Sequence, residues 1–308
     1  MKVIVPNKLT LNQCSVAETD AVDGVAWSSS TTYSKGAMVR YNHVSYKSLD
    51  DGNSGNNPAN TWSGEEAKWQ KIGATMPYRM LDEYVETQTE APAGAPLTFT
   101  VPFNRATSFA LLNLQGANAR VVITDTDEDP DEILLDEEFS LLTDIGQLSL
   151  FDYYFEPLSS LESFIRTEMP LALTGTLHVE LYPGDDTIQA KIGHVIVGRA
   201  RYLGMTKYDA EVGITDYSRK TTDEFGVTTL VRRSFAKTAS LPLYLHPDSS
   251  DSVTKVLQDI RATPCVFQGD NMDSGYAALT MYGWLEDWRH VFAGPNEVEL
   301  NLDIQGLI

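Results

Sequence analysis

Aromatic rings near the N-terminus form the densest group of residues with the chemistry of a binding site. Six tryptophan and tyrosine residues lie within one short polar stretch: Trp27, Tyr33, Tyr41, Tyr46, Trp62 and Trp69. Indole and phenol rings stack on the apolar face of a pyranose, and neighbouring Asn and Asp side chains can bond its hydroxyl groups. The candidate glycan-contacting residues are therefore Trp27, Tyr33, Tyr46, Trp62 and Trp69.

A structural role for the same rings is the competing interpretation. Residues 27–73 contain few aliphatic side chains, so a domain of this size needs its aromatic rings to build a core. We expect most of the six rings to be buried and only a minority to be exposed. Residues 51–57 are rich in Gly and Asn and are followed by Pro58, which is turn chemistry.

Acidic residues offer a second kind of chemistry. Residues 125–132 carry the alternating carboxylates of a calcium loop, but Pro130 stands where such a loop needs glycine and Asp136 where it needs glutamate. A solvated acidic hairpin is the favoured interpretation, with a weak calcium site as the alternative. Residues 136–138 are three adjacent carboxylates, whereas a glycosidase needs two that face each other across a substrate. Catalytic motifs for nucleophilic, zinc-dependent, phosphate-binding and dinucleotide-binding sites are absent, so we predict no enzyme, no metal and no cofactor.

The charge of the chain argues against several partners. The 308 residues carry a formal net charge of -20. Residues 1–74 are electrically balanced, and most of the excess acid lies in residues 75–200. Nucleic acids and anionic membranes both require a basic surface, so we expect no nucleic-acid partner and no membrane insertion. Cys14 and Cys265 are isolated from one another, and residues 3–5 are too short an apolar run for a secretion signal, which favours maturation in a reducing cytoplasm.

The periodicity of the chain predicts a mainly β protein. Apolar and polar residues alternate over 97–103, 177–181 and 298–304, and residues 192–197 form a continuous apolar run typical of a strand buried on both faces. Apolar residues spaced at 253, 256, 257 and 260 predict one helix, with capping residues at 248–251. We expect an N-terminal arm (1–25), a small aromatic-rich β module (26–74), a β-sandwich domain (75–200) and a C-terminal β-rich domain containing the helix (201–308).

The module resembles a known family. Trp27, followed by Tyr33-x-x-Gly36-x-x-Val39, a further Tyr46 and the closing Pro58 and Trp69, is similar to the small chitin-binding-type carbohydrate-binding modules. The resemblance covers residues 26–73 and implies a glycan ligand. The inserted loop at residues 51–57 departs from the family pattern, and no contacting ring can be transferred to this chain from the family.

The remainder of the chain resembles phage tail proteins that carry such a module at the N-terminus. The resemblance rests on the following segments: 154–157 (YFEP), 193–198 (GHVIVG), 216–220 (DYSRK), 223–226 (DEFG), 261–264 (RATP) and 300–307 (LNLDIQGL). It implies a distal-tail or baseplate component of a virion, built of β domains and assembled as a homo-oligomeric ring or around a hub. Its partners would be other tail proteins, with a host-surface glycan as a further ligand, and it would be made in the host cytoplasm.

The charged stretch 216–226, together with Arg232 and Arg233 that follow it, is the predicted assembly interface. Its candidate residues are Asp216, Tyr217, Arg219, Arg232 and Arg233. In an acidic protein the arginines can pair with carboxylates of a neighbouring subunit and so fix the register of assembly. The alternative is an ordinary charged hairpin. Two other functions also remain open at this point, a glycan-degrading enzyme with an accessory binding module and a free lectin-like adhesin.

Overall fold

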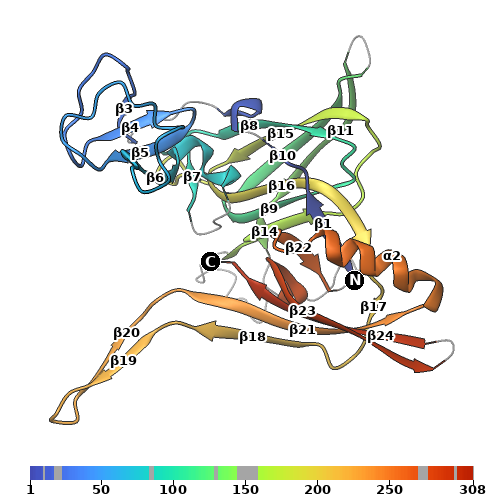
Figure 1. Cartoon of the computed structure of the whole chain (residues 1–308). Helices are drawn as coiled ribbons and strands as arrows, with labels where there is room; N and C mark the ends of the chain where they lie inside the picture. The colour runs from blue at the N-terminus through green and yellow to red at the C-terminus, as the bar shows by residue number, and fades with distance from the viewer. Residues whose placement is uncertain are drawn as a thin grey trace, which may run out of the picture.

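The computed structural model describes residues 1–9, 11–16, 23–82, 87–127, 131–143, 159–269, 277–294 and 297–307. The protein is mainly β, with 54% strand, 9% helix and one α-helix, and its largest sheet curls into a half-barrel. This confirms the predicted fold class. Figure 1 shows a small module, a sandwich and a C-terminal sheet from which a long hairpin projects.

The N-terminal module is a sheet of four short strands. They are β3 (Val25–Ala26), β4 (Met38–Tyr41), β5 (Val44–Ser48) and β6 (Trp69–Ala74). Asn42 and His43 join β4 to β5 in a two-residue turn with φ angles of 51° and 62°. Such a turn needs left-handed backbone at both positions, which Asn adopts more readily than most residues. Long polar loops connect the other strands, so the rings in this module have little aliphatic material to pack against.

A β-sandwich follows the module. One layer contains β11 (Glu132–Ser140), β10 (Asn118–Asp125), β15 (Thr174–Tyr182), β8 (Leu97–Asn104) and β2 (Ser15–Val16). The facing layer contains β14 (Ser163–Arg166), β9 (Ser108–Gln115) and β16 (Lys191–Tyr202). Leu97, Phe99, Val101 and Phe103 are buried between the layers, as their alternation with polar residues predicts.

Strand β16 is buried on both faces, which confirms the prediction from its continuous apolar run. Val195 and Val197 face the sandwich core, while Ile196 packs with Ile4 and Val266 in a second cluster on the other side of the sheet. The strand therefore separates two hydrophobic cores. It ends at Tyr202, so the predicted domain boundary at residue 200 falls within a strand.

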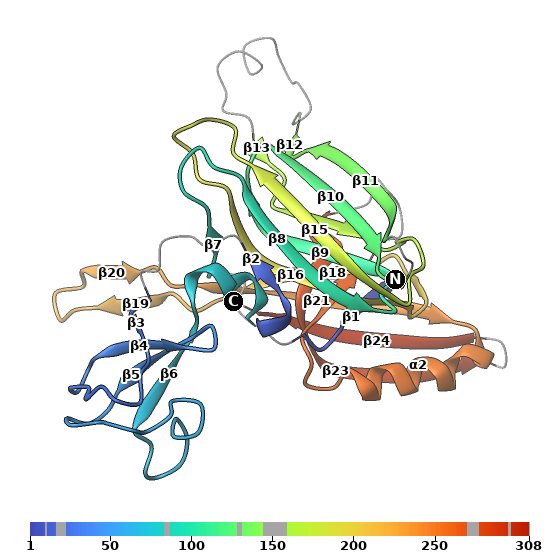
Figure 2. The same cartoon turned by 90° about the horizontal axis from the view of Figure 1, so that it is seen from above.

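The N-terminal strand joins the two large domains. β1 (Lys2–Pro6) pairs with β16 on one side and with β22 (Cys265–Gln268) on the other. Val3 and Ile4 are fully buried, and the amino group of Met1 donates to the Gly204 carbonyl at 2.5 Å. Residues 2–6 thus lie in the middle of a continuous eleven-stranded sheet rather than in a detached arm. Figure 2 shows β1 lying between the sandwich and the C-terminal strands.

The C-terminal domain packs one helix on a sheet. Its strands are β22, β23 (Thr280–Gly294), β24 (Glu297–Gly306), β21 (Phe235–Leu245) and β17 (Met205–Thr206). Helix α2 (Pro247–Asp259) buries Val253 and Leu257 against this sheet, as predicted. The N-cap is His246, whose ring accepts from the Asp248 amide at 3.4 Å, and not one of residues 248–251; Pro247 occupies the first turn, where its missing N–H costs nothing. No helix in the described ranges is both long and apolar enough to cross a membrane.

A hairpin arm leaves the C-terminal sheet. We define it as residues 211–240; it contains β18 (Glu211–Asp216), β19 (Arg219–Thr222), β20 (Thr228–Val231) and the start of β21. β18 pairs with β21 from Glu211↔Ser240 to Asp216↔Phe235, and β19 pairs with β20 beyond a short irregular neck. Figure 1 shows the arm extending away from the rest of the molecule at the lower left.

Candidate functional site

The arm exposes apolar side chains that nothing in the monomer covers. Every residue of β18, β19 and β20 is exposed. The large apolar side chains among the exposed residues of the arm are Val212, Ile214, Tyr217, Phe225, Val227, Leu230, Val231 and Phe235. Phe225 at the tip is 91% exposed and Leu230 is 73% exposed. Exposed apolar surface of this kind marks an interaction site, and an isolated two-stranded hairpin is marginally stable without further packing.

Local hydrogen bonds nevertheless shape the arm. At the tip, Asp223 Oδ1 accepts from the amides of Phe225 (2.9 Å) and Val227 (2.8 Å), and Gly226 supplies the left-handed φ of 80°. At the neck, Asp216 Oδ1 accepts from the Ser218 amide at 2.8 Å, and the Arg233 amide donates to Ser218 Oγ at 3.0 Å. The sequence thus specifies a defined turn and a defined neck on a hairpin that has no core of its own.

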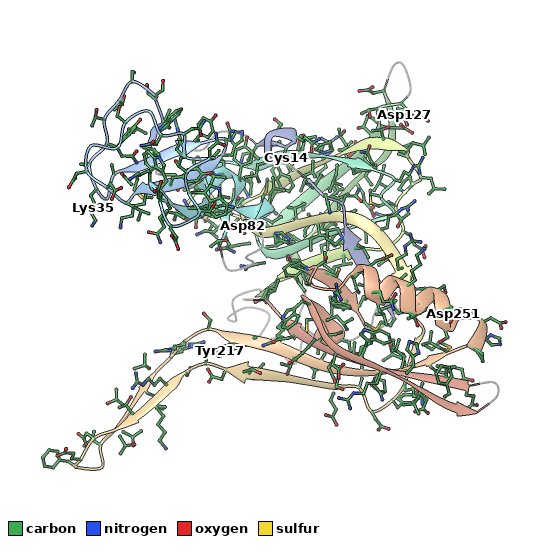
Figure 3. All side chains as sticks on the ribbon, in the orientation of Figure 1. Cys14, Lys35, Asp82, Asp127, Tyr217 and Asp251 are labelled. Carbon is green, nitrogen blue, oxygen red and sulfur yellow. The ribbon has the colours of Figure 1, made fainter. Side chains whose placement is uncertain are left out.

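All five predicted interface residues lie in this arm. Asp216 stabilises the neck by accepting the Ser218 amide, and the hydrogen bonds from Ser218 lower the pKa of its carboxyl. Tyr217 lies at the base of the exposed part, where its hydroxyl accepts from Gln305 Nε2 of β24 at 3.2 Å (Figure 3). Arg219, Arg232 and Arg233 are exposed. The apolar residues of the arm were not among the predicted interface residues, although Phe225 and Leu230 stand out in the sequence as large apolar side chains within a charged stretch.

The arm also carries exposed cations that form no close ion pair among the described residues, although the charge of Arg232 contributes to the lowered pKa of Asp216. Arg219 and Lys220 lie on β19, and Arg232 and Arg233 directly follow β20 on the other side of the hairpin. None of the four has a carboxylate within ion-pair distance in the part of the chain that the structure describes. Four cations gathered in a protein of net charge -20 form the basic segment of the arm.

In the module, three of the five candidate glycan-contacting rings are buried. Tyr33, Tyr46 and Trp69 form its core with Val39, and Trp69 is 0% exposed. The ring centroids of Tyr33 and Trp69 lie 5.4 Å apart in an edge-to-face arrangement, and Trp69 Nε1 donates to the Asn56 carbonyl at 3.0 Å. Burial raises the pKa of Tyr46. These three rings cannot present a face to a sugar, so their candidacy as glycan contacts is withdrawn and they hold the module together.

The two remaining candidates differ from each other. Trp62 is 43% exposed, and Lys71 Nζ lies 5.4 Å from the centroid of its ring. Trp27 is half-buried, with its ring edge-to-face on Tyr41 at a centroid distance of 5.4 Å. Trp62 is therefore the ring of this set best placed to stack on a pyranose, through the face that the Lys71 ammonium group does not cover.

The asparagine-rich loop at residues 51–57 has a structural task. Asn53 is buried and donates to Ser48 Oγ at 3.1 Å and to the Lys68 carbonyl at 3.2 Å. Asn56 in turn donates to Asn53 Oδ1 at 2.8 Å, and Asn57 donates to the Tyr41 hydroxyl at 3.2 Å. These amides satisfy one another and the backbone, so the residues named here are committed to holding the loop.

The acidic runs form ion pairs on the sandwich surface. Asp136 pairs with Arg120 through two 2.8 Å contacts, and Glu137 pairs with Arg166. The Arg120 guanidinium lowers the pKa of Asp136, which is opposite to what a general acid requires. Residues 128–130 of the calcium-like loop, and the segment 154–157, lie outside the described residues. Elsewhere in the described chain, no three His, Cys, Asp or Glu side chains are grouped to hold a metal ion.

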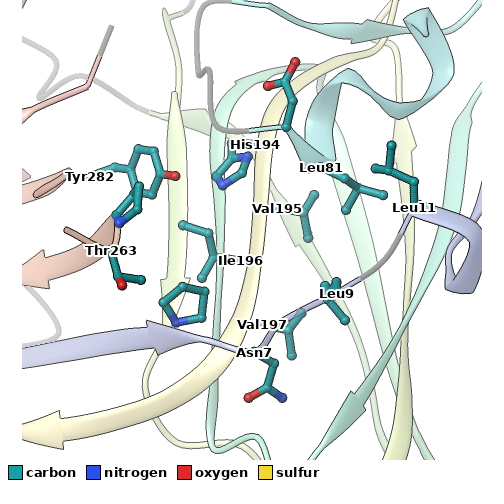
Figure 4. A pocket seen from close by; sticks show the side chains of 13 residues that line it. Asn7, Leu9, Leu11, Leu81, His194, Val195, Ile196, Val197, Thr263 and Tyr282 are labelled. Atoms are coloured by element: carbon teal, nitrogen blue, oxygen red, sulfur yellow. The ribbon is translucent and has the colours of Figure 1, made fainter. Parts of the chain in front are cut away.

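A cavity of about 210 Å³ lies where β1, β16 and the C-terminal domain meet. His194, Ile196, Tyr282 and Leu81 line it together with Asn7 and Leu9 of the N-terminal segment (Figure 4). Burial lowers the pKa of His194 to about 4, and its ring lies against Tyr282. The lining is mostly apolar and His194 is neutral at physiological pH, so the cavity has the character of a packing defect between domains.

Comparisons with known proteins leave the family open. No protein-family model matches this chain, and a search of curated proteins gives no significant match.

Proposed function

We propose that the protein is a structural subunit that assembles with copies of itself through the arm. The observation that carries this proposal is the run of exposed apolar side chains on residues 212–235, at the end of a hairpin with no core. Burying a Phe or Leu side chain contributes about 1.5–3 kcal/mol, so covering several of them would stabilise a subunit interface substantially. A hairpin that projects from one subunit and packs on the next forms a head-to-tail contact, which closes into a ring when the rotation permits.

The assembly we propose is the tail tip or baseplate of a phage, where this chain would contact other tail proteins. Support comes from the resemblance of its segments to distal-tail proteins and from the projecting arm on a β scaffold. The arrangement of carboxylates supports the structural role over the enzymatic one, because Asp136 and Glu137 are occupied by arginines. A glycan-degrading enzyme and a free adhesin are the competing proposals.

A second role is favoured by Trp62. Its exposed ring lies beside Lys71 on a module that resembles chitin-binding-type modules, so we propose that the module contacts a host-surface glycan. Weak single sites become effective when several copies are held in one ring. The module would then recognise a glycan, while the arm would hold the assembly together. The two roles use different residues.

Assembly is tested on the full-length protein by sedimentation velocity and native mass spectrometry over a range of concentrations. The wild type is expected to form a closed oligomer, and Phe225→Ser/Leu230→Ser is expected to shift it towards monomer. The matched control is Leu171→Ser/Leu173→Ser, which removes two exposed apolar side chains away from the arm and should leave assembly unchanged. A wild-type protein that stays monomeric throughout would overturn the proposal.

The location is tested separately by antibody labelling of phage particles under the electron microscope. Label at the tail end supports a tail-tip component. Protein found only free in the lysate, with no label on intact particles, would favour the enzyme or the adhesin.

A further inference from the structure

An acidic groove crosses the C-terminal sheet at the base of the arm. Its lining comes from four adjacent strands: Glu211, Val212 and Gly213 of β18, residues 238–240 of β21, Asp303 and Ile304 of β24, and Glu286 and Asp287 of β23. The groove has a volume of about 510 Å³ and is open to solvent.

Cross-strand pairing places the groove carboxylates in one row. Glu211 lies opposite Ser240, Ser240 opposite Asp303, and Asp303 opposite Asp287. Directly opposite residues share a face, and the neighbouring residues Leu241, Leu302 and Ile304 point into the core beneath α2. The row therefore lies on the sheet face opposite the helix. A register shift next to Glu286 leaves that residue as an extra position between two paired ones, and it is exposed.

Most of this negative charge is uncompensated. Asp287 accepts from Arg289, whereas Glu211, Glu286 and Asp303 have no ion-pair partner among the described residues. Asp303 accepts only a hydroxyl, that of Ser240 at 2.7 Å. Like charges directly opposite each other on a sheet are destabilising, so the pairing of Asp303 with Asp287 lowers the stability of the sheet. A cation bound over this row of carboxylates would relieve that repulsion.

We propose that the basic segment of the arm (Arg219, Lys220, Arg232 and Arg233) docks in the acidic groove of a second copy. This inference rests on the proposed function and names the surface that receives the arm. Unpaired cations and unpaired carboxylates occur on separate parts of one chain, and the arm continues outward from the same sheet that carries the groove. The arm thus points away from its own groove, and only the groove of another copy lies in front of it.

The geometry fits a head-to-tail repeat. Glu211 and Arg219 are separated along an extended hairpin by roughly 25 Å at about 3.3 Å per residue. That spacing is comparable with the width of a domain of about 100 residues, whose radius of gyration is about 13 Å. The basic segment of one copy therefore lies about one domain width from its own groove, which is the separation that a head-to-tail contact with a neighbour requires.

The test is a charge exchange between two variants. Arg232→Glu/Arg233→Glu cancels the charge of the basic segment, and Glu211→Lys/Glu286→Lys cancels the charge of the groove at two exposed positions. Each variant alone is expected to dissociate at a concentration at least about tenfold above that of the wild type, because the attraction between the two surfaces is lost. An equimolar mixture of the two is expected to associate more tightly than either variant alone, since the unaltered arm of the groove variant then meets the unaltered groove of the arm variant. The readout is sedimentation velocity, with circular dichroism to verify folding.

The control is Glu65→Lys/Glu66→Lys, which changes the net charge equally at exposed positions in the module and should leave assembly intact. Two outcomes would overturn the docking site while leaving arm-mediated assembly standing. In one, the groove variant forms the same oligomers as the wild type. In the other, mixing the two variants does not restore association. A monomeric wild type would instead overturn the proposed function itself. Assembly only on addition of DNA or of another tail protein would assign the basic segment to that partner and also overturn the inference.

Discussion

The ring of His194 lies against that of Tyr282 with 4.9 Å between centroids, which joins the sandwich to the C-terminal domain. His194 belongs to β16 and Tyr282 to β23. The imidazole also bonds the Met80 carbonyl, while its Nδ1 is buried without a partner among the described residues. A neutral histidine at this junction therefore acts as a packing residue, and its protonation would place a charge between domains.

The free energy of unfolding should depend on pH through His194. Burial lowers its folded-state pKa to about 4, against an ordinary value of 6.5 for histidine. Between these pH values the unfolded chain binds a proton that the folded chain does not, so stability falls as pH decreases from 6.5 to 4 and levels off below. The loss is about 3 kcal/mol at about 1.4 kcal/mol per pKa unit.

The measurement is denaturant unfolding at several pH values for the wild type and for His194→Gln, which keeps a donor for the Met80 carbonyl. Asp82 lines the same cavity and is present in both proteins, so the difference between the two curves isolates the histidine. Parallel curves across this pH window would contradict the assignment.

Both thiols should be unreactive in the folded protein. Cys14 and Cys265 are free and buried, and burial raises their pKa values to about 11 and about 12. Because the thiolate is the reactive form, labelling with a disulfide reagent at pH 8 should be very slow, and both thiols should react once guanidinium unfolds the chain. Rapid stoichiometric labelling of either thiol under native conditions would show that the segment around it opens.

Two tryptophans of the module should separate ligand binding from stability. Trp62→Ala removes an exposed ring, so binding to chitin oligosaccharides should weaken by about tenfold while the module stays folded. Trp69→Ala removes a fully buried ring and should destabilise the module by about 3–5 kcal/mol. Oligosaccharide titration and thermal unfolding of the full chain measure the two effects. Unchanged binding by Trp62→Ala would exclude this ring as a glycan contact.

Local patterns predicted the elements of this fold well. Alternation over 97–103 gave the inward face of β8, and the spacing of Val253 and Leu257 gave the buried face of α2. Both depend on side chains a few positions apart, and the period of the element alone decides which of them face the core. The interface candidate at residues 216–226, with Arg232 and Arg233, came instead from the resemblance to phage tail proteins and stays a prediction.

Long-range relationships could not be predicted. Residues 3–5 read as a short apolar strand, but nothing local indicates that the strand pairs with β16 and β22, which lie far along the chain. Trp62 and Trp69 are the same residue type in the same module, and only the packing of Val39 and Tyr33 around Trp69 distinguishes a core ring from a surface ring. The groove is a row made by four strands, so its carboxylates are scattered in the sequence.

The contact between β1 and β16 should be intolerant of a single added methyl group. At Gly198 of β16, a Cβ atom would lie 2.0 Å from the Val5 carbonyl oxygen and 3.0 Å from Pro6 Cα, both backbone atoms of β1. Both are backbone atoms, so the clash can be relieved only by a shift of β1 or β16, whereas a flexible side chain could swing aside. Gly198→Ala should therefore lower the free energy of unfolding by about 1–3 kcal/mol, as overpacking does in other cores.

Gly73→Ala is the matched control, since a Cβ there meets nothing within 4 Å. Denaturant unfolding of both variants measures the difference, and Gly73→Ala should stay within about 0.5 kcal/mol of the wild type. Hydrogen exchange at Val3 and Ile4 adds a local readout, because a displaced β1 exposes their amides. If Gly198→Ala unfolds like the wild type and keeps these amides protected, the N-terminal strand is not pressed against β16 as closely as the structure places it.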